Sequence, residues 1–204
     1  MKPWRVATTA EVVGRIREMT SAVGDRPPVI AVDGRSNSGK KTFSERLVAA
    51  WPGAAVVHTD DIAWWHSVLD WTGLLVDGVL TPVRAGRAVA FRPPQWDVRG
   101  WPGAVEVPAG CTLLLVEGVG SGRRSLTPHL DGIVWAEAPA ADREERDRAD
   151  VAAGLIAPEN FDAWMREEIP FVEAERTWER AGLVVAGWAA LPHDPEREFV
   201  IADS

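Results

Sequence analysis

The chain contains no tyrosine, one cysteine and three lysines among its 204 residues. A single cysteine, Cys111, cannot form a disulfide within one chain, and its place before an apolar segment predicts a buried, inert thiol. No apolar run is long enough to cross a membrane, and the N-terminal segment lacks the hydrophobic stretch of a signal peptide. We therefore expect a soluble, cytoplasmic protein with no membrane partner.

Acidic residues outnumber basic ones by 30 to 22, so the formal net charge is −8. Proteins that bind nucleic acids generally need a basic face, so we expect no nucleic-acid partner. Two of the three lysines are adjacent, Lys40 and Lys41, in a chain that otherwise uses arginine. Although the chain has no tyrosine, it contains eleven tryptophans. Since indole rings are costly to expose, most of them should line the core or a pocket.

The most informative segment is an apolar, β-branched run that leads into a glycine-rich loop. Gly34, four further residues, Gly39 and Lys40 have the spacing of a phosphate-binding loop. Glycines let the backbone wrap around a phosphate, and the helix that follows would direct its positive N-terminal end at the same anion. A chance match in a glycine-rich turn is the alternative, but the preceding strand and the helical spacing of Phe43 and Leu47 favour a phosphate loop. The predicted nucleotide-binding residues are Gly34, Arg35, Ser36, Asn37, Ser38, Gly39, Lys40, Lys41 and Thr42.

One position departs from the usual pattern of such loops. A serine or threonine normally follows the loop lysine and holds Mg²⁺ through its hydroxyl, but Lys41 stands here and Thr42 comes one place late. Either Thr42 substitutes for the missing hydroxyl while Lys41 turns outward, or Lys41 supplies positive charge in place of the metal ion.

Apolar strands alternate with helical patterns along the chain, which predicts an α/β fold with a doubly wound parallel sheet flanked by helices. We interpret residues 1–204 as one domain. The expected strands lie near 29–32, 54–58, 111–116, 132–136 and 183–186. Two long helices are expected, one over 9–23 with Thr9 as its N-cap and one over 158–180 that is kinked at Pro170. Residues 62–110 should form a substrate-side insertion with short helices. We further expect a lid over 140–150 and a loosely ordered tail over 192–204.

Acidic residues follow three of the predicted strands: Asp33, the pair Asp60 and Asp61, and Glu117. Ligands bind at the carboxyl ends of parallel strands, so these carboxylates should share one site. Asp60 suits a base that orients a hydroxyl and takes its proton, Glu117 suits an Mg²⁺ ligand, and Asp33 suits a tether of the loop backbone. Acids at such positions also cap helices, but three beside a phosphate loop favour function.

Residues 142–150 carry arginines among acids. Arg143 and Arg146 could close over bound phosphates as part of a mobile lid. A solvated helix with internal ion pairs explains the same composition, and the sequence alone leaves both interpretations open. The four histidines lack the spacing of zinc ligands, and we interpret His58 as a core residue.

Taken together, these segments resemble the uridine kinase-like branch of the P-loop kinases, in its actinobacterial form. The resemblance runs from about Val29 to Ala186. It implies a nucleoside-kinase-like sheet with a short lid, ATP or GTP with Mg²⁺ as cofactors, and transfer of the γ-phosphate to a small-molecule hydroxyl, as in uridine or cytidine. Its motifs are the Val-Asp-Gly-Arg-Ser and Ser-Gly-Lys parts of the loop, Asp60-Asp61, Pro94-Gln95-Trp96-Asp97, Leu115-Val116-Glu117-Gly118-Val119 and Glu175–Ala181.

The motifs and the resemblance together predict roles for individual residues. The catalytic set is Asp60, Lys40, Glu117, Arg143 and Arg146; the substrate-binding set is Asp61, Trp64, Trp65, Trp96 and Asp97; the metal ligands are Thr42, Asp60 and Glu117. The chain departs from the family at Lys41 and at Trp64-Trp65 after the aspartate pair.

Two alternatives to the kinase remain open at this stage. The chain could bind a nucleotide or a phosphate with little or no transfer, or it could be a recruited scaffold that acts on a specialised metabolite. Apolar residues of the helix over 158–180 belong either to the core or to a homodimer interface.

Overall fold

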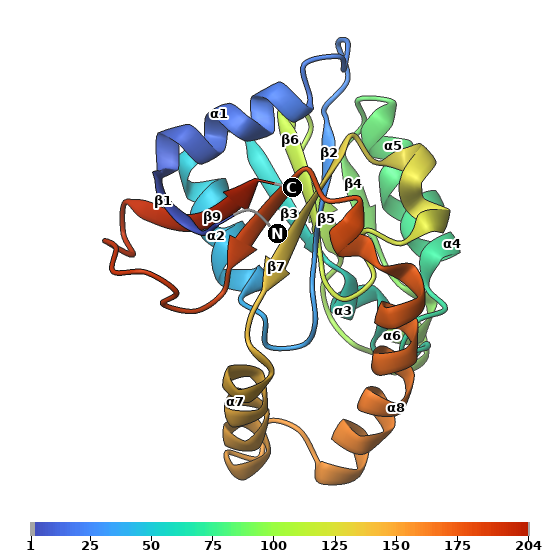
Figure 1. The fold of residues 1–204 in the computed structure, drawn as a ribbon. Coiled ribbons are helices and arrows are strands. Elements are labelled where there is room, and N and C mark those ends of the chain that lie inside the picture. Colours follow the sequence, from blue (N-terminus) through green and yellow to red (C-terminus); the bar gives the residue numbers. More distant parts are fainter. Residues whose placement is uncertain (1–2, 204) are drawn as a thin grey trace.

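A seven-stranded sheet forms the centre of the computed structural model, which describes residues 3–203 (Figure 1). The strand order is β1-β9-β8-β7-β2-β6-β3. The strands from β8 to β3 pair in parallel, whereas β9 is antiparallel to both of its neighbours. The α/β fold with a mainly parallel sheet is thus confirmed. The bounds are Arg5–Thr8 (β1), Val29–Asp33 (β2), Ala54–His58 (β3), Leu113–Glu117 (β6), Gly132–Glu137 (β7), Leu183–Ala186 (β8) and Glu198–Asp203 (β9).

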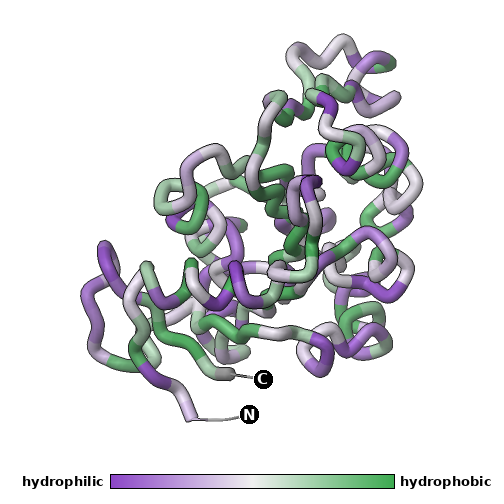
Figure 2. The backbone as a smooth tube through the Cα atoms, turned by 90° about the horizontal axis from the view of Figure 1, so that it is seen from above, coloured by the Kyte–Doolittle hydropathy of each residue, from purple (hydrophilic) through white to green (hydrophobic). Residues whose placement is uncertain are grey.

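Strand β2 is central, and all five of its residues are buried. Because successive side chains point to opposite faces, Ile30 and Val32 pack in one apolar cluster while Val29 and Ala31 belong to two others. Both faces of the sheet are therefore covered, as parallel sheets require. Figure 2 shows the same arrangement, with apolar strands in the interior and polar loops around them.

Helices α1 (Thr9–Met19) and α2 (Lys40–Ala50) cover one face of the sheet, and shorter elements together with part of α8 (Pro158–Glu175) cover the other (Figure 1). Residues 62–110, expected as a substrate-side insertion, form most of this second layer. The short elements of this layer are α3 (Thr59–Ala63), α4 (Thr72–Leu75), the π-helical turn η1 (Val76–Leu80), α5 (Thr81–Arg84) and α6 (Pro94–Val98). The paired strands β4 (Val89–Phe91) and β5 (Val105–Val107) complete it.

Helices α7 (Ala140–Ala152) and α8 (Pro158–Glu175) extend beyond the carboxyl ends of the parallel strands, at the lower edge of Figure 1. Helix α8 runs through Pro170 and ends five residues earlier than predicted, because Arg176 adopts a left-handed backbone with φ 47°. Two short 3₁₀ turns complete the fold, η2 (Arg124–His129) and η3 (Thr177–Glu179). No helix described over residues 3–203 is long and apolar enough to cross a membrane.

The two ends of the chain differ from the prediction. Residues 198–203 were expected in a loose tail, but they form β9 and pair with both β1 and β8; Ser204 lies outside the described residues. This pairing joins segments about 190 residues apart, so no local pattern reveals it. Helix α1 begins at Thr9, but its N-cap is Thr8 and not Thr9 as predicted, because Thr8 and Glu11 form a reciprocal capping box; the helix ends at Met19, four residues before the predicted end.

Candidate active site

The phosphate loop joins β2 to α2, and its last residue caps the helix. Gly39 has φ 90°, and a Cβ there would lie 2.6 Å from the Cα of Gly187, so only glycine fits. Helix α2 begins at Lys40, which leaves the first N–H groups of the helix available to an anion. The Lys40 ammonium donates across the loop to the Arg35 carbonyl oxygen at 2.8 Å.

Asp33 tethers the loop, as the sequence predicted. Its buried carboxylate accepts hydrogen bonds from the N–H groups of Gly34 at 2.8 Å, Gly120 at 2.7 Å and Gly122 at 3.0 Å. Burial raises the pKa of Asp33, and these N–H groups oppose that rise. One side chain therefore fixes the start of the loop to the segment that follows β6.

A cavity of about 950 Å³ opens at the carboxyl ends of the parallel strands. The phosphate loop, the ends of β3 and β6, residues 60–68, and helices α7 and α8 with the turn between them all contribute to its lining. This cavity brings together many of the predicted site residues. They are Ser36, Asn37, Ser38, Gly39, Lys40, Lys41, Asp60, Asp61, Trp64, Trp65 and Glu117.

Other predicted residues lie away from the cavity. Thr42 is exposed on α2 and does not line it. Trp96 is buried beneath the site and donates its indole N–H to the Asp61 carbonyl at 2.9 Å. Asp97 accepts a hydrogen bond from Arg92 Nε at 2.7 Å on the surface. Gly34 and Arg35 also lie outside the lining.

The two arginines predicted to belong to a lid contact backbone carbonyl groups and do not line the cavity. Arg146 on α7 donates to the carbonyl oxygens of Asn37 at 2.7 Å and Gly187 at 2.8 Å, and Arg143 donates to that of Ala138 at 3.2 Å. The neighbouring Asp147 accepts from the Asn37 amide at 2.8 Å. Helix α7 is therefore docked on the phosphate loop.

Asp60 and Asp61 lie in the first turn of α3 and both line the cavity. The surrounding walls desolvate the Asp60 carboxylate and raise its pKa; the nearby charges of Glu117 and Asp61 raise it further, while Lys40 lowers it. Within residues 3–203 no hydrogen bond ends on the Asp60 carboxylate. Its oxygens are therefore open to a ligand, as a general base requires.

Glu117 is paired with His58, which the sequence analysis had interpreted as a core residue. His58 Nδ1 lies 2.5 Å from Glu117 Oε2, and this hydrogen bond is the main cause of the raised pKa of His58. Both side chains line the cavity. They are the last residues of β3 and β6 and lie opposite each other in the strand register. The position of His58 at the carboxyl end of a predicted strand was a weak local signal for the site, but its pairing with Glu117 was not visible in the sequence.

The donor set suits a magnesium ion that is also held by phosphate oxygens and water. Among the described residues, no three His, Cys, Asp or Glu side chains converge to hold a metal by themselves. Magnesium typically takes one or two carboxylates together with substrate phosphates and keeps several waters. The open Asp60 carboxylate, with Glu117 near it, matches that pattern.

Two tryptophans that line the cavity, Trp64 and Trp65, are unusually exposed, as is Trp101, which contacts Trp65 from outside the lining. Trp64 is 57% exposed, and the rings of Trp65 and Trp101 lie 5.1 Å apart in an edge-to-face contact. Trp65 also adopts a left-handed backbone, with φ 62°, which is costly for a bulky side chain. Trp71, by contrast, is a core residue with 1% exposure.

Sequence reasoning did not single out two further residues near the site. Glu168 on α8 binds the phosphate loop, as described below. Arg123 lies between the rings of Trp71 at 3.9 Å and Phe171 at 4.8 Å, and its Nε donates to the Gly120 carbonyl at 2.8 Å. Burial lowers the pKa of Arg123 to about 10. Neither residue belongs to a recognisable local motif.

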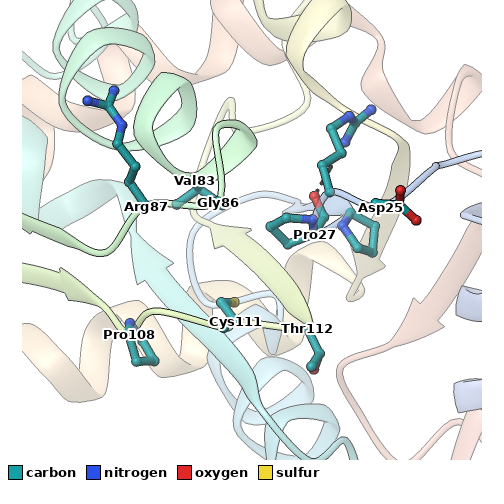
Figure 3. A pocket seen from close by; sticks show the side chains of 11 residues that line it. Asp25, Pro27, Val83, Gly86, Arg87, Pro108, Cys111 and Thr112 are labelled. Carbon is teal, nitrogen blue, oxygen red and sulfur yellow. Dashed lines mark hydrogen bonds between the residues drawn. The ribbon is translucent and has the colours of Figure 1, made fainter.

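A second cavity, of about 300 Å³, lies at the opposite edge of the sheet (Figure 3). Pro27 and Cys111 line it, and they precede β2 and β6 respectively, so the length of these strands separates it from the phosphate loop. Cys111 is half-buried, and burial raises the pKa of its thiol. This cavity contains none of the predicted site residues.

The mainly parallel sheet flanked by helices, with a glycine-rich loop between β2 and α2, is a fold also seen in other solved structures. Two of these structures cover most of the chain. The chain superimposes on a candidate fructose transport system kinase from Silicibacter sp. TM1040 with a TM-score of 0.61 and 22% identity, covering 86% of this chain and 95% of that one. It superimposes on a "possible uridine kinase" from Bacillus stearothermophilus with a TM-score of 0.55 and 16% identity, covering 85% and 98%. No protein-family model and no curated sequence matches the chain.

Proposed function

We propose that the protein transfers the γ-phosphate of ATP or GTP to a hydroxyl group of a small molecule, with a nucleoside as the favoured acceptor. The observation that carries this proposal is the single cavity that holds both the phosphate loop and the open Asp60 carboxylate. A loop alone would indicate phosphate binding. A desolvated carboxylate with a raised pKa in the same cavity adds the group that a transfer reaction requires.

The chemistry follows from the positions of these groups. The acceptor oxygen attacks the γ-phosphorus, its proton passes to Asp60, and the bond from the γ-phosphorus to the bridging oxygen breaks to release the nucleoside diphosphate. The N–H groups at the start of α2 and the Lys40 ammonium neutralise charge on the phosphates. A magnesium ion held by Asp60 and by Glu117, directly or through water, would add Lewis-acid stabilisation of that charge.

The acceptor would lie against the tryptophans at the cavity mouth. Trp64 and Trp65 offer flat, apolar ring surfaces, and Asp61 supplies an acceptor for hydroxyl or amino groups beside them. A planar base attached to a sugar fits such a surface. A free sugar can also lie against an indole ring, so the acceptor panel must include fructose as well as uridine and cytidine.

The test is mass-spectrometric detection of phosphorylated product from the purified protein, ATP and this panel, with Mg²⁺ and with chelator. We expect one acceptor to gain a phosphate only when Mg²⁺ is present. The Asp60→Asn variant should form little product, while the variant of an exposed aspartate outside the cavity, Asp77→Asn, should match the wild type. Absence of both product and ADP across the panel would overturn the proposal for these acceptors.

Nucleotide binding without transfer is the second candidate function. It is favoured by Lys41, whose side chain lines the cavity, and by Thr42, which does not. Under this alternative the Lys41 ammonium takes the place of the metal ion. ATP would then bind equally well with Mg²⁺ and with chelator, and no ADP would form.

A further inference from the structure

Helix α8 carries a carboxylate that reaches the phosphate loop. The Glu168 residue is 0% exposed. Its Oε1 accepts hydrogen bonds from Arg35 Nε at 2.9 Å and from the Ser36 N–H at 3.1 Å. Its Oε2 accepts from the Ser36 hydroxyl at 2.5 Å and from the indole N–H of Trp164. Four donors thus converge on one enclosed side chain.

This arrangement excludes a direct chemical role for Glu168. A carboxylate has about four lone-pair sites, and all four are used here. The guanidinium of Arg35 balances its charge, so the buried ion carries the partner that burial requires. Glu168 therefore has no free oxygen for a proton or a metal ion. Its effect must be exerted through the loop residues that it holds.

The loop residues held by Glu168 in turn position the phosphate-binding lysine. The carbonyl oxygen of Arg35 accepts from the Lys40 ammonium at 2.8 Å and from the Ser38 N–H at 3.1 Å. A displacement of Arg35 would therefore displace both Lys40 and the turn that leads into α2. This chain of contacts runs from α8 to the cavity in three steps: Glu168 to Arg35, Arg35 to Lys40, and Lys40 to the cavity.

The same carboxylate also holds a wall of the cavity. The Trp164 indole N–H donates to Glu168 and also to Ser36 Oγ at 2.9 Å, and Trp164 lines the cavity with its neighbours Phe161 and Met165. The conformation of the loop and the docking of α8 are therefore coupled through one buried group. Nucleotide binding at the loop must then depend on that group.

We propose that Glu168 is a positioning residue for the phosphate loop. It holds the Arg35–Ser36 segment, and through that segment Lys40, in the conformation that binds a nucleoside triphosphate. The nucleotide part of this inference rests on the proposed function. The positioning part concerns the loop itself and is tested without any nucleotide.

The experiment compares wild type, Glu168→Gln and the control Glu167→Gln, which changes an exposed carboxylate on the next residue of the same helix. Glutamine keeps the shape of the side chain, but its NH₂ group would face donors. The first measurement is amide hydrogen exchange of a peptide covering residues 34–40, without nucleotide. The second is the Kd for ATP with Mg²⁺, measured by calorimetry at a temperature where circular dichroism shows all three proteins folded.

We expect exchange in this peptide to be faster by about tenfold or more in Glu168→Gln, and the Kd for ATP to rise by about tenfold. Both should be unchanged in Glu167→Gln. If Glu168→Gln lowers thermal stability but leaves loop exchange and the Kd at wild-type values, the residue is only structural and the proposal is wrong. If the wild type itself binds no ATP, the proposed function fails, while the exchange comparison still decides whether Glu168 positions the loop.

Two milder variants keep the test available if Glu168→Gln does not fold. Ser36→Ala and Trp164→Phe each remove one donor to Glu168 and leave the carboxylate in place. Each should accelerate loop exchange in the same direction and by a smaller factor. Wild-type exchange in both variants would overturn the proposal.

Discussion

Asp60 lines the cavity of the phosphate loop and Glu168 binds the loop itself, and the surroundings of these two carboxylates are opposite. Asp60 is open to the cavity, and no hydrogen bond within residues 3–203 ends on its carboxylate. Glu168 is fully enclosed and accepts four. Desolvation raises the pKa of Asp60. Burial acts in the same direction on Glu168, but the hydrogen bonds from Ser36, Trp164 and Arg35 outweigh it and lower the pKa.

The comparison shows that hydrogen-bond donors, more than desolvation, decide what a carboxylate can do. A desolvated acid without donors holds a proton more readily and keeps its oxygens free for a ligand. A buried acid with a full set of donors stays ionised and becomes a fixed point of the structure. Asp60 therefore suits catalysis, and Glu168 suits positioning.

Replacement of the open carboxylate should have the largest effect on the reaction. We expect Asp60→Asn to lower the rate of phosphoryl transfer by about 10²–10⁴-fold, because general-base catalysis contributes factors of that size. The Kd for ATP should change far less, since the loop and Lys40 remain. Product formation and ATP calorimetry on the same preparation check both statements. A transfer rate close to that of the wild type would mean that a group other than Asp60 acts as the general base.

Replacement of the enclosed carboxylate should have the largest effect on stability. Removal of one partner of a buried ion pair leaves the other charge uncompensated, and we expect Glu168→Gln to lower the free energy of unfolding by about 3 kcal/mol. Urea denaturation measures this quantity. The exposed control Glu167→Gln should remain within about 0.5 kcal/mol of the wild type. Equal stability of all three proteins would mean that the four hydrogen bonds contribute nothing net.

The lowered pKa of Glu168 also predicts how its contribution depends on pH. A carboxyl group whose pKa is lower in the folded state stabilises the protein fully above its unfolded pKa of about 4.3, and this contribution is lost as the pH falls through the folded value. The difference in unfolding free energy between wild type and Glu168→Gln should therefore be constant near neutral pH and shrink in acid. Urea denaturation from pH 7 to pH 3 checks this. A difference that does not change with pH would contradict the sign of the shift.

The phosphate loop and the carboxylates that line its cavity could be predicted from the sequence, because the patterns that indicate them are local. Strand, glycine loop, lysine and helix all lie within residues 29–42, and Asp60 and Glu117 directly follow or end apolar strands. Parallel strands bring such ends to one edge, so local pattern and general topology were sufficient to gather them. The tether role of Asp33 was recognised for the same reason.

The contacts of Glu168 with the phosphate loop could not be predicted, because they join residues that are distant in the sequence. Glu168 lies 132 residues from Ser36, and its place in an ordinary amphipathic helix gives no indication of a buried contact. Sequence reasoning assigned the donors of Arg35 and Ser36 to phosphates, whereas the structure places them on Glu168. His58 was interpreted as core because its pairing with Glu117 depends on the register of two strands 59 residues apart.

Replacement of Lys41 should have the smallest effect on the reaction. Lys41 is the cation near the open carboxylate Asp60, as Arg35 is the cation at the enclosed carboxylate Glu168. Arg35 is fixed on Glu168, whereas Lys41 lines the cavity, and within residues 3–203 no hydrogen bond involves its ammonium group. Burial raises the pKa of Asp61, and the hydrogen bond with Glu117 raises that of His58; the charge of Lys41 opposes both rises through space. We expect Lys41→Thr to keep or raise the transfer rate, with a change of less than about tenfold, because the substitution restores the hydroxyl next to Lys40. The rate and its dependence on Mg²⁺ concentration measure the effect. Total loss of activity would make Lys41 part of the mechanism, and loss of ATP binding in chelator would instead support a lysine that replaces the metal ion.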